Sequence, residues 1–199
     1  MDVPELLARA CALVPGDARS DAGLSAGDVR EYLRLTEWDS ALGILGDFPD
    51  SPWQTVEFWS LLERAAGRMW LDREVAWCRW RGWEARHGVI RAELRLVPPD
   101  AAGGRRLPIP GEGRLRPMWA IGAPSPDAGL HVARVWVESA PEIPPGGHGV
   151  IRLAPLTPAD WRHLEPGAPI TMHEGRPVAG TATIVQVTAP PGHDGAEGE

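Results

Sequence analysis

Hydrophobic residues recur with the period of an α-helix over the first 88 residues of the chain. Runs of this kind, bounded by capping residues and glycines, are typical of short amphipathic helices. Ser51 and Gln54 match the two ends of a capping box, and Pro52 suits the first position of the helix that follows. The pattern predicts about four helices, over residues 3–14, from Ser25 to a stop at Gly46, over 52–66, and from Asp72 to a stop at Gly88.

From residue 89 onward the hydrophobic period changes from about 3.6 to about 2. In residues 89–97, VIRAELRLV, hydrophobic and charged side chains alternate as a half-buried strand requires. Segments rich in proline and glycine separate six such runs, which favours a small closed antiparallel barrel or a sandwich. The six predicted strands cover residues 89–97, 115–121, 130–138, 149–155, 168–174 and 177–187.

The two patterns together predict an α+β protein in which a helical domain, residues 1–88, packs on a six-stranded antiparallel β-barrel, residues 89–189. Residues 190–199 contain no apolar anchor, so they are predicted to form a disordered acidic tail. Two domains of this size are each near the lower limit for an adequate core, and a shared interface would stabilise both. Candidates for that interface are Trp77, Trp80 and Trp83, which lie on one stripe of the fourth helix.

The composition is that of a globular protein, with 43% hydrophobic and 24% charged residues. No apolar run approaches the ~20 residues that cross a bilayer. The first residues lack the basic region of a signal peptide, so we expect a cytoplasmic protein with no membrane partner. Cys11 and Cys78 lie in separate apolar helical contexts and are predicted to be free thiols.

The chain contains no lysine, and all 20 basic residues are arginine. This excludes a phosphate-binding P-loop and Schiff-base chemistry, because each requires a lysine amine. The histidines and cysteines show no metal-site spacing, and no G-x-S-x-G sequence is present. We therefore predict no catalytic residue, no cofactor, no metal and no nucleotide partner. An enzyme would require convergence of groups such as His131, His163, His173 and Glu165.

The formal net charge of −7 is unevenly distributed. Residues 1–60 carry eleven acids and four arginines, whereas residues 61–95 carry five acids and eight arginines. Charge complementarity steers association between proteins. An acidic helical face over about residues 17–57 is therefore a candidate surface for a protein partner.

Seven of the ten tryptophans lie within 46 residues, from Trp38 to Trp83. We interpret them as core and domain-interface residues, the alternative being an aromatic cage or a base-stacking surface. Arg79, Arg81 and Arg86 interleave with these tryptophans. We interpret the arginines as the solvated side of the helix, the alternative being a site for an acidic partner or a nucleic acid.

The segment AELRLVPPDAAGGRRLPIPGEGRLRPMW, residues 92–119, contains the turn Gly103-Gly104-Arg105, then Pro108 and the step Arg116-Pro117. With IPPGGHGVIRL and ITMHEGRPVAGTATI further along, it resembles the third domain of translation elongation factor Tu over residues 90–188. The resemblance implies a β-barrel. In that family the domain contacts the GTPase domain, the exchange factor and the T stem of transfer RNA. The GTPase domain is missing here, so nucleotide hydrolysis is not implied.

By position, Arg105 stands where that family has the arginine of its G-G-R turn, a residue associated with the RNA face. Glu174 and Gly175 match the family's glutamate-glycine turn, whereas Arg176 lies one place earlier than the family arginine. Guanidinium groups around a Gly/Pro loop can hold phosphates or carboxylates bidentately. The candidate macromolecule-binding residues are therefore Arg105, Arg106, Arg114, Arg116, Glu174 and Arg176.

The helical half, with EWDSALGIL and AAGRMWL, resembles small helical immunity proteins of bacterial toxin systems, some of whose partner toxins engage elongation factor Tu. We therefore expect a non-catalytic macromolecule-binding protein whose partner is a protein, such as a toxin or a translation factor. The alternative is an accessory protein that binds transfer RNA or ribosomal RNA through the arginine loop. A third possibility is an enzyme with a pocket between the two halves.

Overall fold

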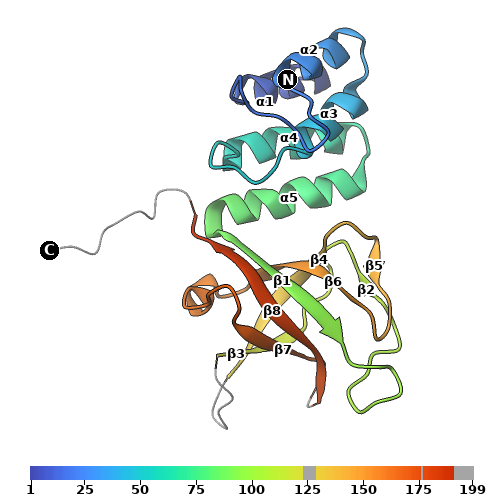
Figure 1. The fold of residues 1–199 in the computed structure, drawn as a ribbon. Helices are drawn as coiled ribbons and strands as arrows, with labels where there is room; N and C mark the ends of the chain where they lie inside the picture. Colours follow the sequence, from blue (N-terminus) through green and yellow to red (C-terminus); the bar gives the residue numbers. More distant parts are fainter. Residues whose placement is uncertain (123–128, 176, 191–199) are drawn as a thin grey trace, which may run out of the picture. The chain divides into compact units, whose positions relative to one another are not determined.

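The computed structural model describes residues 1–122, 129–175 and 177–190, and the chain divides into two compact units, Met1–Arg86 and His87–Glu199 (Figure 1). Each unit contains a hydrophobic core of its own. Helices precede strands along the chain, so the predicted α+β class is confirmed. Residues 191–199, which belong to the predicted disordered tail, lie outside the described residues.

Five helices precede the barrel, where the sequence predicted about four. Asp2 begins the first one with a complete capping box: its carboxylate accepts from the Glu5 N–H at 3.0 Å, and the Glu5 carboxylate accepts from the Asp2 N–H at 2.9 Å. Ser25 and Asp28 form the equivalent box of the second helix. The helices are α1 (Val3–Ala12), α2 (Ala26–Arg34), α3 (Trp38–Gly46), α4 (Val56–Arg68) and α5 (Asp72–His87).

The single helix predicted from Ser25 to Gly46 is wrong, because the chain turns between α2 and α3. Thr36 adopts a left-handed conformation with φ of 61°. The Thr36 N–H donates to Leu33 O at 3.2 Å and the Glu37 N–H to Tyr32 O at 3.0 Å. These two bonds form a Schellman motif, which satisfies the last carbonyls of α2. No glycine marks this stop, so the sequence pattern continued through it.

The helix predicted over residues 52–66 begins later, at Val56. Its N-cap is Thr55, whose hydroxyl accepts from the Phe58 N–H at 3.4 Å. The predicted reach of Gln54 back to Ser51 does occur, since the Gln54 Oε1 accepts from the Ser51 N–H at 3.3 Å. That contact closes a turn ahead of the helix instead of capping it, and the Gln54 side chain is buried there.

Six strands close into an antiparallel barrel in the order β1-β6-β4-β3-β7-β8, which confirms the predicted barrel. The six sequence segments with alternating patterns each supply one barrel strand. A further pair, β2 and β5, forms a separate two-stranded sheet, and η1 (Pro158–Trp161) is a short 3₁₀ helix. The strands are β1 (Val89–Leu96), β2 (Ile109–Pro110), β3 (Met118–Ile121), β4 (Leu130–Val137), β5 (Glu142–Ile143), β6 (His148–Pro155), β7 (Pro169–His173) and β8 (Val178–Thr188).

Alternation along the strands fills the barrel interior with side chains. On β1, Ala92, Leu94 and Leu96 are buried while Glu93 and Arg95 are exposed. β1 pairs with β6 on one side and with β8 on the other, and this second pairing closes the barrel. Within the part of the chain that the structure describes, no helix has the length and apolar character of a membrane span.

Candidate binding loop and buried polar network

The arginine loop, residues 97–117, connects β1 to β3 and contains four of the six candidate binding residues. Figure 1 shows it leaving the end of β1 and running through β2. In the small sheet, Ile109 pairs with Ile143, and both side chains are buried. This pairing attaches the middle of the loop to the segment before β6.

Two glycines allow the loop to pack tightly against neighbouring backbone. A Cβ on Gly103 would overlap the carbonyl oxygen of Val178 at the start of β8, and the φ of Gly103 is +90°. A Cβ on Gly104 would overlap the carbonyl oxygen of Pro98 in the loop itself. The Gly-Gly pair of the sequence therefore has a steric role, which is to let the loop contact backbone on two sides.

Arg105 holds the loop in place through all three nitrogens of its guanidinium group. One Nη forms an ion pair with Glu174, the Nε–H donates to Leu107 O at 3.1 Å, and the other Nη donates to Pro108 O at 3.2 Å. The Arg105 side chain is only 11% exposed, and this burial lowers its pKa, although an arginine stays charged at neutral pH. Arg105 and Glu174 therefore connect the arginine loop to the β7–β8 turn.

The remaining polar groups of the loop point to solvent. Arg106 is exposed, and next to it Leu107 is a large hydrophobic residue with 71% exposure. Arg114 is exposed and pairs with Glu112 at 2.9 Å. Arg116 lies near Arg134, whose pKa is lowered by burial and then by the positive charge of Arg116. The loop thus combines an exposed apolar side chain with three exposed arginines.

Of the two remaining candidates, Glu174 is used inside the barrel unit and Arg176 lies outside the described residues. Sequence reasoning grouped Arg105 with the other arginines and missed its bracing contact. No local sequence pattern indicates this contact, because Glu174 lies 69 residues from Arg105 along the chain. Contact of any of these residues with a macromolecule stays a prediction.

The histidines weighed for an enzyme or a metal site have separate partners. The His131 Nδ1 lies 3.2 Å from a carboxylate oxygen of Asp160, and the His173 Nε2 lies 2.9 Å from the Thr171 hydroxyl. His163 and Glu165 are exposed, and among the described residues no hydrogen bond or ion pair joins either of them to His131, whose partner is Asp160. The described part of the chain also contains no group of three or more His, Cys, Asp or Glu side chains able to hold a metal ion.

The helical unit contains a buried polar network around Arg81. The Arg81 side chain is 6% exposed, and its guanidinium pairs with Asp50 at 2.6 Å and with Glu84 at 3.0 Å. It also donates to the Gln54 Oε1 at 3.0 Å, while the Trp80 indole donates to Glu84 at 2.8 Å. The predicted place of Arg81 on the solvated side of the helix is therefore wrong.

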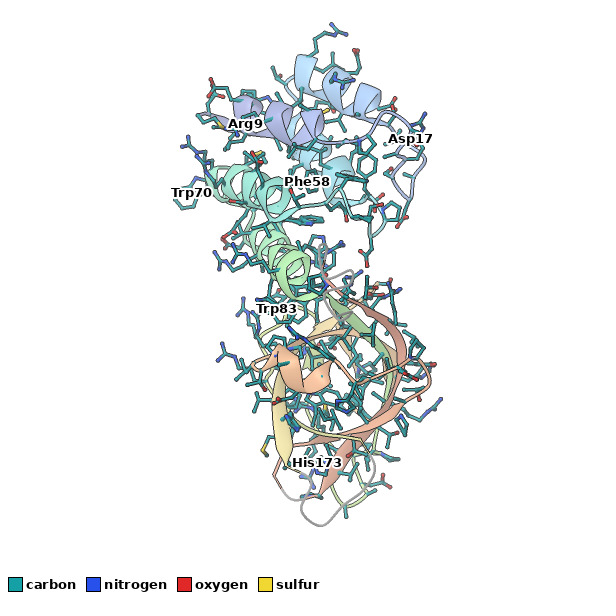
Figure 2. The ribbon with its side chains drawn as sticks, turned by 90° about the vertical axis from the view of Figure 1, so that its left-hand side faces the viewer. Arg9, Asp17, Phe58, Trp70, Trp83 and His173 are labelled. Atoms are coloured by element: carbon teal, nitrogen blue, oxygen red, sulfur yellow. The ribbon has the colours of Figure 1, made fainter. Side chains whose placement is uncertain are left out.

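The physical reason is that aromatic rings and carboxylates together accommodate the buried charge. The Arg81 Cζ lies 4.6 Å from the centroid of the Trp59 ring and 5.3 Å from that of Trp77. Trp59 continues into a row of edge-to-face contacts, with ring centroids 5.0 to 5.5 Å apart, formed by Phe48, Trp53, Phe58 and Trp59. Phe58 is labelled within the helical unit in Figure 2.

Part of the tryptophan cluster is core, since Trp59 belongs to the hydrophobic core of the helical unit and Trp38 and Trp53 pack against it. Trp59 and Trp80 are buried, whereas Trp70 is 88% exposed, so a core role for Trp70 is wrong. Packing of Trp77, Trp80 and Trp83 on the barrel stays a prediction.

The acidic helical face is partly neutralised by local partners. Asp28 bonds to Ser25, which lowers the pKa of that carboxyl, and Glu57 pairs with Arg9 at 3.0 Å. Glu31 pairs with Arg34. Several acids remain exposed with no side-chain hydrogen bond or ion pair among the described residues, namely Asp17, Asp21, Glu37, Asp39 and Asp47.

We expect neither cysteine of the folded chain to react with iodoacetamide at about pH 8, because the thiolate is the reactive form. Burial, followed by the charges of Glu63 and Glu74, raises the pKa of Cys78 from 9.0 to about 12. Burial also raises the pKa of Cys11, whose thiol donates to Ala26 O at 3.3 Å. Mass spectrometry should detect labelling only after unfolding in urea, and rapid labelling of the folded chain would contradict the burial.

The same shift has a consequence for stability. Because the folded-state pKa of Cys78 is raised, the unfolded chain releases this proton first. The contribution to stability is therefore complete below about pH 9 and is lost as the pH rises towards about 12.

Comparison of the chain with protein-family models and with curated proteins finds no match in either case.

Proposed function

We propose that the chain is a non-catalytic binding protein whose arginine loop contacts an acidic surface of a protein partner. The observation that carries the proposal is that one arginine of the loop is used for internal contacts while its other arginines face solvent. Arg105 is committed to internal contacts that hold the backbone in place, while Leu107 and three other arginines are exposed. A rigid loop loses little entropy when a partner binds to it, which favours affinity.

Two features favour a protein partner over RNA. Leu107 is an exposed aliphatic side chain of the kind that fills a pocket on a protein, and it has no stacking surface for bases. The formal net charge of −7 opposes general attraction to phosphate backbones. The resemblance of residues 90–188 to the third domain of elongation factor Tu supports a partner linked to translation, such as a translation factor or a toxin that engages one.

Transfer RNA or ribosomal RNA is the second candidate, favoured by one specific observation. Arg106 and Arg116 are both exposed on the same loop. Guanidinium groups attract phosphate oxygens. In this alternative, affinity falls steeply with salt because counterions are released on binding.

The proposed absence of catalysis is supported by the state of the reactive side chains. Cys78 is buried with a raised pKa, so it is protonated at neutral pH. His131 has Asp160 as its partner, and Asp160 in turn accepts from the Thr157 hydroxyl at 2.8 Å. In this arrangement the histidine is not hydrogen-bonded to the hydroxyl, as a base that activates a nucleophile needs to be.

We expect the double variant Arg106→Gln with Arg116→Gln to lose about tenfold or more in affinity for the partner, because arginines are frequent in the energetic centre of interfaces. A matched control is Arg95→Gln with Arg162→Gln. It removes the same charge from exposed positions elsewhere in the barrel unit. Proteins captured from lysate by each form, and transfer RNA at two salt concentrations, serve as probes.

A protein captured by the unmodified chain and by the control, but lost with the loop variant, supports the proposal. Equal capture by both double variants contradicts it. Binding of transfer RNA that is strongly salt-dependent and is lost only with the loop variant selects the RNA alternative.

A further inference from the structure

The turn between α4 and α5 contains a tryptophan in an unfavourable backbone conformation. Trp70 has φ of 60°. Its N–H donates to Gly67 O at 3.4 Å, and the Leu71 N–H donates to Ala66 O at 3.1 Å. These bonds form a Schellman motif in which the left-handed position, occupied most often by glycine, is held by Trp70. The helix ending itself needs no side chain at this position.

The Trp70 side chain is also not used by the core. It is 88% exposed, whereas its neighbours Met69 and Leu71 pack against the hydrophobic core of the helical unit. Figure 2 shows Trp70 extending from the end of α4 away from the helices. The exposed indole leaves apolar surface in water, and the left-handed backbone of a non-glycine residue costs further free energy. Neither feature helps the chain to fold, and the two together point to a role in binding.

Exposed arginines without partners surround this turn. Arg64, Arg68 and Arg73 are exposed, and their side chains make no hydrogen bond or ion pair within the described part of the chain. Arg64 and Arg68 are one helical turn apart, and the Cα of Trp70 lies within about 8 Å of that of Arg68 and about 11 Å of that of Arg73. The acids in and next to this stretch are Glu63, which pairs with Arg79 at 2.9 Å, and Asp72 and Glu74 at the start of α5. The three arginines therefore outnumber the two remaining acids, and the turn carries a small excess of positive charge although the chain is acidic.

We propose that the α4–α5 turn is a second docking site, at which Trp70 packs against an apolar side chain of an acidic protein segment while Arg64, Arg68 and Arg73 pair with the carboxylates of that segment. Tryptophan and arginine are the residues most enriched among interface positions that dominate binding energy. The positive charge selects an acidic partner and accelerates its association. This site is separate from the arginine loop, on another unit of the chain.

The test uses the full chain with an array of synthetic acidic peptides, each with one Leu, Phe or Trp, and a matched array in which Asp and Glu are replaced by Asn and Gln. The key variant is Trp70→Gly, which keeps the backbone turn. Thr36→Gly is its control, because Thr36 occupies the same position in the Schellman motif after α2. The loop variant Arg106→Gln with Arg116→Gln separates this site from the proposed barrel site.

We expect Trp70→Gly to weaken binding of the acidic peptides by at least about tenfold, while Thr36→Gly and the loop variant bind as the unmodified chain does. We also expect both glycine variants to melt at or above the temperature of the unmodified chain, since each relieves a left-handed non-glycine residue. An unchanged affinity for Trp70→Gly overturns the proposal, as does a lower melting temperature, which would make the indole structural.

The remaining outcomes are equally decisive. Failure of every acidic peptide to bind overturns the proposal, and so does equal binding of the neutral array. Preferential binding of a short single-stranded oligonucleotide assigns the turn to nucleic acid instead. Self-association of the unmodified chain that disappears in Trp70→Gly, measured by sedimentation, assigns it to a second copy.

Discussion

We expect Arg81→Met to lower the free energy of unfolding of the helical unit by about 3–5 kcal/mol, as removal of one partner from a buried ion pair usually does. Methionine preserves most of the side-chain volume but provides no charge and no N–H donors. Glu84, whose side chain is 1% exposed, would lose its guanidinium partner, and Gln54 would lose a donor. Urea titration followed through the helical circular dichroism signal measures the effect.

Arg79→Met provides the matched control on the same helix. Arg79 pairs with Glu63 at 2.9 Å, but its side chain is 65% exposed, so the expected cost is about 1 kcal/mol or less. The double variant Arg81→Met with Glu84→Gln should recover part of the loss, because no buried carboxylate is then left without its partner. Equal effects of Arg81→Met and Arg79→Met would show that the network does not stabilise the unit.

The barrel strands could be predicted because each one has a local pattern of alternating residues that identifies it. In β1, charged residues alternate with Ala92, Leu94 and Leu96, and a period of two over eight residues has no helical interpretation. Pro- and Gly-rich segments between strands then fix where each strand ends. Strand order needs information that alternation does not contain, because pairing of β1 with both β6 and β8 joins segments far apart in sequence.

The helix boundaries were less predictable because two of the stops lack glycine. Thr36 and Trp70 both adopt left-handed conformations at helix ends, and neither residue type signals such a position. Gly88, which ends α5 with φ of +91°, carries the usual signal and was predicted. A turn formed by a residue that does not favour it is visible only in the structure.

The candidate binding residues divide in the same way. The sequence identified the arginine loop, but it could not separate Arg105, whose partner Glu174 is 69 residues distant, from exposed Arg106 beside it. Similarly, Arg81 and Arg79 look alike in the sequence, although one is buried among carboxylates and aromatic rings and the other is exposed. The role of an arginine is set by partners brought together by the fold.

We expect Gly103→Ala to destabilise the barrel unit by about 3 kcal/mol or more, combining overpacking with a left-handed non-glycine residue. The new Cβ would overlap the Val178 carbonyl oxygen, so the arginine loop would have to move away from β8. Arg105 lies two residues after Gly103, so a shift of the loop would also disturb the contacts of Arg105 with Glu174 and Pro108. Hydrogen exchange of barrel peptides, measured across a urea titration, gives the loss in the free energy of unfolding.

Gly175→Ala separates the two contributions, because Gly175 has φ of +95° but no atom within 4 Å of an added Cβ. This variant retains the backbone strain without the overlap, so we expect a cost of about 1–2 kcal/mol. The difference between the two alanine variants then measures the close approach of the loop to β8. If the proposed binding depends on a fixed loop, Gly103→Ala should also weaken partner binding. This is measured without urea, where Gly103→Ala and Gly175→Ala are both folded. Equal stability of the two variants would mean that the loop yields to the added methyl group, and the bracing assigned to Gly103 and Arg105 would be wrong.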